Sequence, residues 1–233
     1  MRASLNPQAA ADLMQRIRDT RPPREGLHLS DLLQCSRKTW WKGTYGLGEE
    51  DDAFTLITSL GKSYHNLIEG AGEETFVIDG IHLTPDEITN IIPYHDIESL
   101  GRHNAVIVEY KTTRYSSKKT IEDMNNYVDQ VGGYCALLGV NKARLHIFHL
   151  VGDYRNVQPV HRCYDLEFND GELERWRREL NRRRVLIETA QSIDSIPLTE
   201  HVNWECKNCP LKDTHCPGGG GERLGAFPYM EVE

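Results

Sequence analysis

The sequence has no long hydrophobic run and no excess of positive charge. Its longest apolar stretches, such as residues 145–151, are far shorter than the roughly 20 residues that a membrane-spanning helix needs. The start of the chain also lacks the apolar core of a secretion signal, so we expect a cytoplasmic protein without a membrane partner. The formal net charge of -8 argues against a protein that coats nucleic acid nonspecifically, although a nuclease with local basic patches remains compatible with it.

The composition is that of an ordinary globular protein. The 233 residues suffice for one well-buried domain, and 39% of them are hydrophobic while 27% are charged. We expect an N-terminal helical arm at residues 1–28, a core at residues 29–200 and a cysteine-rich tail at residues 201–233.

Hydrophobic periodicity predicts an alternation of helices and strands. Helical spacing and stop signals predict helices at residues 6–20, 30–42, 55–69, 121–138 and 170–191. Alternating and β-branched residues predict strands at residues 76–88, 105–113, 143–152 and 160–168. This order is typical of an α/β fold in which helices flank a central sheet.

The six cysteines indicate metal or redox chemistry rather than disulfides, because thiols in the cytosol are kept reduced. Cys206, Cys209 and Cys216 lie close together in a tail that is rich in proline and glycine and has no hydrophobic core of its own. Such spacing suits ligands that converge on one metal or cluster.

A fourth ligand is needed, and Cys35 is the best candidate. Cys135 and Cys163 lie in a helix and a strand, where small buried hydrophobic residues are usual. Cys35 lies instead inside the predicted helix at 30–42, next to a basic and aromatic run. Spacing leaves open a structural zinc site with these four thiolates, or with three and His215, and either site would tie the tail to the N-terminal helix.

Glu109 and Lys111 are two residues apart on a predicted strand, so their side chains project from the same face. Glu109, an upstream aspartate and the backbone carbonyl of Tyr110 could bind a hard divalent cation, while Lys111 assists the attacking water. An isolated Glu-x-Lys pair is more often structural, so this interpretation depends on the residues around it.

The upstream aspartate is Asp86 or Asp96. We prefer Asp86 because it ends the predicted strand at 76–88, whereas Asp96 lies in a stretch that looks like a loop. His65 on the predicted helix at 55–69 could complete the metal shell. Gln130 and Tyr134 project together from the helix at 121–138, which suits a contact with substrate or with Lys111, although each alone is more often ordinary packing.

Taken in order, these residues resemble the RecB-like nucleases of the PD-(D/E)XK superfamily: His65, Asp86, Glu109, Lys111, Gln130 and Tyr134. With the four cysteines added, the chain looks like the CRISPR-associated exonucleases, which share that cluster arrangement with the AddB nuclease domain and have stand-alone relatives in bacteriophages. Two features depart from the family pattern: Thr-Pro-Asp86 stands where Gly-x-x-Asp is common, and the segment at residues 89–104 is long.

The resemblance implies a restriction-endonuclease-like mixed sheet, a 4Fe-4S cluster, dependence on Mg or Mn, and exonucleolytic cleavage of single-stranded DNA, often from 5′ to 3′. It is also compatible with a CRISPR integrase or recombination partner and with a homo-oligomer. Two alternatives remain: an endonuclease that trims CRISPR spacer precursors, and a cluster-bearing DNA-binding module without catalysis.

Six side chains are predicted to contact DNA through phosphate binding or base stacking: Arg37, Lys38, Trp40, Arg114, Lys118 and Lys119. The arginine-dense helix at 170–191 could add to them. Glutamates are interleaved there, so a solvated charged face is the interpretation we favour for that helix.

Overall fold

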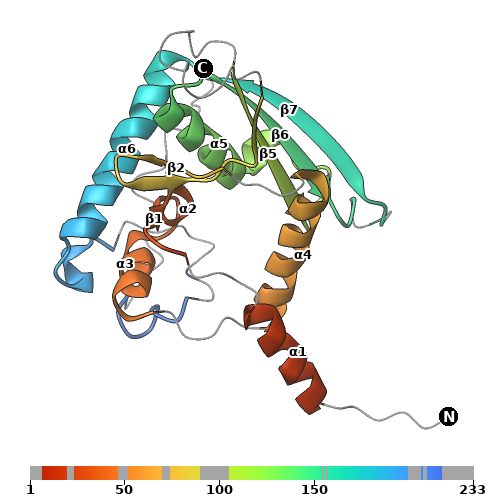
Figure 1. The fold of residues 1–233 in the computed structure, drawn as a ribbon, viewed down its shortest axis with the longest axis horizontal. Helices are drawn as coiled ribbons and strands as arrows, with labels where there is room; N and C mark the ends of the chain where they lie inside the picture. Colours follow the sequence, from red (N-terminus) through yellow and green to blue (C-terminus); the bar gives the residue numbers. More distant parts are fainter. Residues whose placement is uncertain are drawn as a thin grey trace.

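Two β-sheets with helices packed on them form the fold (Figure 1). A computed structural model describes residues 7–19, 24–46, 52–69, 74–89, 105–153, 155, 157–198, 206 and 209–216. The helices are α1 (Pro7–Asp19), α2 (Leu29–Leu32), α3 (Ser36–Tyr45), α4 (Asp52–Glu69), α5 (Asn125–Leu138) and α6 (Asp170–Thr189). The strands are β1 (Leu27–His28), β2 (Phe76–Ile78), β3 (Ile81–Leu83), β4 (Glu87–Thr89), β5 (Val106–Thr113), β6 (Lys142–His149) and β7 (Val160–Glu167). No helix in these residues has the length and apolar character to span a bilayer.

The larger sheet has the strand order β4-β5-β6-β7. β5 pairs parallel with β6, whereas β4 and β7 pair antiparallel with their neighbours. Parallel neighbours need a crossover connection, and α5 supplies it by packing on β5 and β6. A mixed sheet with helices packed on it confirms the predicted α/β fold.

The strand predicted at 76–88 is divided among both sheets. Asp79 and Gly80 both have positive φ, at 52° and 76°, which suits the tight turn of a hairpin between β2 and β3. This hairpin and β1 form a small sheet with the order β1-β3-β2. The last part, β4, pairs instead with β5, which brings the residue before it next to the central strand. β1 belongs to this small sheet, so the predicted arm at 1–28 is not purely helical.

The helix predicted at 30–42 is also divided. Cys35 has an extended backbone, with φ −61° and ψ 119°, and is the N-cap of α3 rather than a residue inside a helix. The backbone N–H of Thr39 donates to the Cys35 carbonyl at 2.9 Å, so α3 begins at that carbonyl.

α4 contacts β5 of the larger sheet, and α1 contacts α4 and extends away from the sheets (Figure 1). On the other side, α5 packs against α6 and against the larger sheet, which forms the main apolar core. A second apolar cluster consists of Trp40, Ile193, Ile196 and Leu211, with Trp41 and Cys209 packed beside it. This cluster joins α3 to the segments that follow α6.

α5 and α6 can approach each other closely at Gly132 because glycine has no side chain. A Cβ atom there would lie 2.7 Å from Cζ2 of Trp176, a buried and rigid ring. We expect Gly132→Ala to destabilise the protein by about 1–3 kcal/mol through overpacking, measured by thermal unfolding. Gly43→Ala is the matched control, because a Cβ atom at that helical position would meet nothing within 4 Å. Equal melting temperatures of the two variants would contradict this account of the α5–α6 contact.

Candidate active site

An acidic and a basic side chain occupy the middle of the larger sheet. Glu109 and Lys111 project from one face of β5, and the Lys111 ammonium contacts Oε1 of Glu109. Glu109 is 1% exposed, so its carboxylate is shielded from water. A buried carboxylate that is charged must be paired or hydrogen-bonded within the protein. The two groups are therefore in contact on one face of β5, as their spacing suggests.

α5 brings two further polar side chains to this pair. Gln130 Nε2 donates to Oε1 of Glu109 at 2.9 Å and to the hydroxyl of Tyr134 at 3.1 Å. The Tyr134 hydroxyl in turn donates to the Thr84 carbonyl at 3.0 Å. Tyr134 is only 3% exposed, and its hydroxyl links Gln130 to the segment before β4.

Asp86, the residue before β4, approaches Glu109 and Lys111 from the neighbouring strand. Its Oδ2 accepts a hydrogen bond from the backbone N–H of Tyr110 at 2.6 Å. The antiparallel register pairs Glu87 with Val108, which places Asp86 opposite Glu109. The rival aspartate, Asp96, lies outside the described residues.

The charges of both carboxylates act on the Lys111 ammonium. Burial by itself would lower the pKa of Lys111, but the charges of Glu109 and Asp86 outweigh it and raise the pKa above its usual value. The pKa of Tyr134 is also raised, first by burial and then by Glu109. Lys111 is thus protonated and Tyr134 is a neutral hydrogen-bond donor at neutral pH.

The donor set suits a hard divalent cation. Two carboxylates, Asp86 and Glu109, and the nearby carbonyl of Tyr110 are oxygen ligands of the kind that Mg²⁺ and Mn²⁺ prefer. In the described part of the chain, no three His, Cys, Asp or Glu side chains are grouped as a metal site. The predicted further ligand, His65, is on α4, but its side chain lies outside what the structure describes.

Tyr127 is a neighbour of the pair that the sequence pattern did not single out. It lies on α5 three residues before Gln130 and packs, half-buried, against the main apolar core. The spacing Tyr-x-x-Gln-x-x-x-Tyr on one helical face is the signal that could have identified it.

The six cysteines differ in how deeply they are buried. Cys35 is buried, and Arg37, two residues later, donates to the carbonyl of His215 at 2.7 Å, which brings the start of α3 next to the residue before Cys216. Cys209 packs against the second apolar cluster. Cys163, expected to be buried, is exposed on β7 instead, while Cys135 is buried in the main core as expected.

Two residues predicted to contact DNA are buried. Arg37 is 7% exposed, and its guanidinium donates to the carbonyls of Ile196 and His215. Trp40 belongs to the second apolar cluster, and its Nε1 donates to the Ala190 carbonyl at 3.0 Å. These contacts argue against a role for either side chain in DNA binding, because both hold α3 to the end of the chain.

The segment that follows β5 carries three of the four remaining predicted DNA contacts, and Lys38 is the fourth. Arg114 is exposed, and Lys118 forms an ion pair of 3.2 Å with Asp153 while most of its side chain stays exposed. The Lys119 ammonium lies 4.5 Å from the centre of the Tyr115 ring. Lys38 on α3 is half-buried. Positive charge thus lies within a few residues of Lys111 along the chain.

The arginines of α6 are mostly engaged within the protein. Arg177 donates to the Ala136 carbonyl at 2.6 Å, and Arg182 and Arg183 both donate to Glu179 at 2.8 Å. Arg183 also donates to the carbonyl of Leu32 at 3.1 Å. The pairing of Arg182 with Glu179 fits the favoured interpretation of a solvated charged face, whereas Arg183 is buried instead of solvated.

Comparison with known proteins identifies the family. The PD-(D/E)XK nuclease superfamily model matches residues 96–217, which is more than half of the chain. The crystal structure of SSO0001 is 15% identical and covers 91% of this chain and 96% of its own, with a TM-score of 0.48. An alkaline exonuclease from Laribacter hongkongensis is 14% identical and covers 69% of this chain and 84% of its own, with a TM-score of 0.36. Both likenesses are too weak to bear on activity.

No curated protein matches the chain. The family match includes Glu109, Lys111, Gln130 and Tyr134, the residues that are joined by hydrogen bonds between β5 and α5. The chain belongs to the PD-(D/E)XK nuclease superfamily.

Proposed function

We propose that the chain is a metal-dependent exonuclease that degrades single-stranded DNA from 5′ to 3′. The observation that carries the proposal is the buried pair of Glu109 and Lys111 with Gln130 on one side and Asp86 on the other, in a member of a nuclease superfamily. Strand preference and direction rest on the resemblance to the CRISPR-associated exonucleases.

Glu109, an aspartate and the Tyr110 carbonyl would hold a Mg²⁺ or Mn²⁺ ion, with His65 as a further ligand. Such an ion lowers the pKa of a coordinated water and stabilises negative charge on phosphate. Lys111 is close enough to the carboxylates to hold the attacking water by a hydrogen bond and to neutralise charge beside it. Gln130 fixes the orientation of the Glu109 carboxylate, and Tyr134 fixes Gln130.

The choice between the two aspartates rests on geometry. Asp86 lies opposite Glu109 and its charge acts on Lys111, which favours Asp86. The family match begins at residue 96, so it does not extend to Asp86.

Paired variants separate the two aspartates. We expect one of Asp86→Asn and Asp96→Asn to lose cleavage by two orders of magnitude or more, and the other to keep most of it, since one carboxylate is needed beside Glu109. Cleavage rates and Mn²⁺ affinity by titration calorimetry make the comparison. Full activity and full Mn²⁺ affinity in both variants would overturn the proposed ion site.

DNA labelled at either end tests the activity and its direction. Purified protein is incubated with 5′-labelled or 3′-labelled single-stranded DNA, with the matching duplex, and with a circular single strand that offers no end. With Mg²⁺ or Mn²⁺ we expect early release of the 5′ label from the linear single strand, little cutting of the duplex or circle, and none with EDTA. Cutting of the circle would show that the protein is an endonuclease and not an exonuclease. Stable DNA binding without cutting would indicate a non-catalytic module.

We also propose that Cys35, Cys206, Cys209 and Cys216 hold a 4Fe-4S cluster. The donor set is all thiol, as such clusters require, and the bond from Arg37 to the His215 carbonyl brings the first and last cysteine segments together. The second apolar cluster beside Cys209 offers a surrounding of low polarity. Protein purified without oxygen is expected to be brown, with broad visible absorbance and bound iron and sulfide. A colourless protein that contains zinc would assign the same thiols to a structural zinc site.

A further inference from the structure

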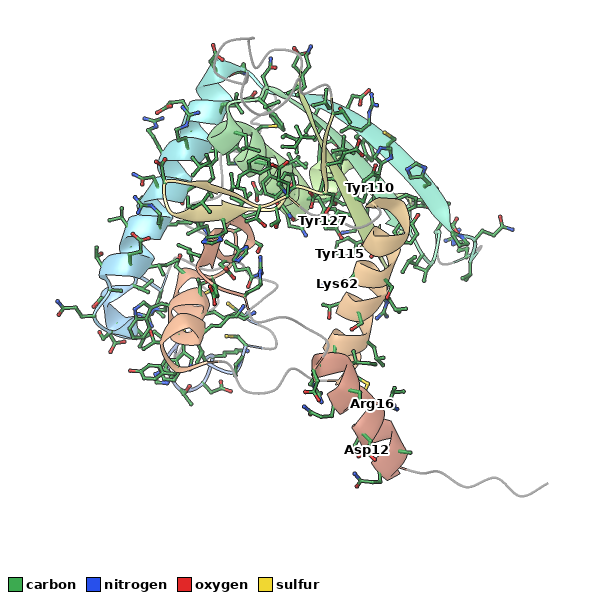
Figure 2. All side chains as sticks on the ribbon, in the orientation of Figure 1. Asp12, Arg16, Lys62, Tyr110, Tyr115 and Tyr127 are labelled. Atoms are coloured by element: carbon green, nitrogen blue, oxygen red, sulfur yellow. The ribbon has the colours of Figure 1, made fainter. Side chains whose placement is uncertain are left out.

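The segment at residues 114–119 combines an exposed aromatic ring with positive charge. Tyr115 lies two residues after β5 and is 40% exposed, and Figure 2 labels it at this end of the strand. Arg114 and Lys118 are exposed, and the Lys119 ammonium lies 4.5 Å from the centre of the Tyr115 ring. A single exposed tyrosine is common on protein surfaces, but here three cationic side chains lie within four residues of it.

Hydrogen bonds hold the backbone of Tyr115 in place. Its N–H donates to Oγ1 of Thr113 at 3.0 Å, and its carbonyl lies 3.0 Å from Nδ1 of His149. Because a carbonyl can only accept, Nδ1 of His149 carries the proton of this bond. His149 is fully buried at the end of β6, so it is a rigid donor. Both backbone polar groups of Tyr115 are therefore satisfied within the protein.

The residues that follow β6 hold the same segment at two further points. The N–H of Leu150 donates to the Thr113 carbonyl at 2.9 Å, and the N–H of Ser117 donates to the Gly152 carbonyl at 2.7 Å. Ser117 is only 7% exposed. The segment is thus a preformed surface, and a ligand that binds to it does not have to order the backbone first.

The segment keeps a positive charge after its ion pair is taken into account. Residues 114–119 contain three cationic side chains and no acidic one. Asp153 offsets one of them through its ion pair of 3.2 Å with Lys118, whose side chain stays 65% exposed. Exposed ion pairs are weak, so Lys118 can exchange this carboxylate for a phosphate group.

An exposed ring among cations suits single-stranded nucleic acid. Cationic side chains attract phosphate groups of either single-stranded or duplex DNA, whereas an aromatic ring stacks on the face of an unpaired base. In a duplex the bases already stack on one another, and taking one out costs free energy. A stacking tyrosine therefore adds affinity for unpaired DNA alone.

We propose that residues 114–119 form a docking surface for single-stranded DNA, in which Tyr115 stacks on a base. The inference rests on the proposed function, since it takes single-stranded DNA as the ligand, and it adds Tyr115 to the predicted DNA contacts. Tyr115 follows Lys111 by four residues, which is at most about 14 Å of extended backbone. One strand of DNA can therefore reach the docking surface and the candidate active site together.

Binding of labelled DNA in EDTA tests the inference without cleavage. We expect Tyr115→Ala to weaken the binding of a single-stranded oligonucleotide by about 10-fold, the size expected for the loss of one stacked base. Tyr115→Phe keeps the ring and should bind like wild type. The affinity of Tyr115→Ala for the matching duplex, and the salt dependence of its binding, should stay unchanged because no cation is removed.

Two controls separate stacking from a general effect on the surface. Tyr45, the other exposed tyrosine of the described residues, is 66% exposed and ends α3, so Tyr45→Ala should bind DNA like wild type. An abasic oligonucleotide keeps the phosphates but has no base to stack. Wild type should bind it about 10-fold more weakly than the normal strand, and Tyr115→Ala should bind it as wild type does.

The outcomes distinguish this inference from the proposed function. Equal affinity of Tyr115→Ala and wild type for single-stranded DNA overturns the inference, as does an equal loss for the duplex or the abasic strand, or a loss that follows the melting temperature. If such a protein still cleaves single-stranded DNA, the proposed function stands. Wild type that binds through Tyr115 but cleaves nothing with Mg²⁺ or Mn²⁺ overturns the proposed function and supports the docking surface.

Discussion

Glu109→Gln is expected to lower the single-turnover rate of DNA cleavage by on the order of 10³-fold, because a metal ion contributes several kcal/mol to such reactions and each 1.36 kcal/mol is tenfold. The amide has the shape of the carboxylate but no charge, so the pocket loses attraction for a divalent cation. The Mn²⁺ affinity measured by calorimetry should fall together with the rate. DNA binding in EDTA should persist, since the basic segment after β5 is unchanged.

Two controls separate loss of the metal ligand from misfolding and from a general loss of negative charge. Glu109 is the buried partner of Lys111, so thermal unfolding must show that the variant folds; Asp86 is expected to remain as a counter-charge for Lys111. Glu167→Gln, at an exposed position at the end of β7, removes the same charge far along the sheet and should cleave like wild type. A folded Glu109→Gln that cuts DNA at the wild-type rate would refute the assignment of this carboxylate to the ion.

The elements nearest the pocket could be predicted from the sequence because their patterns are local. β5 is a run of β-branched residues, and its period of two places Glu109 and Lys111 on one face without knowledge of the fold. The helix with Gln130 and Tyr134 follows by the same argument from helical spacing, although it begins at Asn125, after a short 3-10 turn at Ile121–Asp123. The α/β class follows from the order of these elements.

The division of the strand predicted at 76–88 could have been inferred from Asp79-Gly80, a dipeptide typical of hairpin turns. The pairing of its last part with β5 could not, because pairing between strands distant in sequence depends on the whole chain. The same holds for Arg37 and Trp40, whose neighbours, Ile196, His215 and Ala190, come from the far end of the sequence. A basic and aromatic run looks the same whether it faces DNA or the protein itself.

The contacts between α3 and the segments that follow α6 lead to a second prediction, which concerns the free energy of unfolding. The structure joins α3 to the later segments through Arg37, Trp40 and the second apolar cluster, and four thiols lie in the same two regions of the sequence. A cluster ligated by Cys35 and the tail would close a loop of most of the chain, and a cross-link over about 100 residues is worth about 5 kcal/mol. That contribution would come in addition to the binding energy of the metal itself.

Cys35→Ser is accordingly expected to lose bound iron and visible absorbance and to lower the free energy of unfolding by about 5 kcal/mol, measured with urea under anaerobic conditions. Cys163→Ser is the matched control, because Cys163 is exposed on β7 and lies outside the proposed ligand set; it should keep both iron and stability. Full iron content in Cys35→Ser would remove Cys35 from the ligands. Iron loss without destabilisation would mean that the Arg37 and Trp40 contacts hold the two ends together without a cluster.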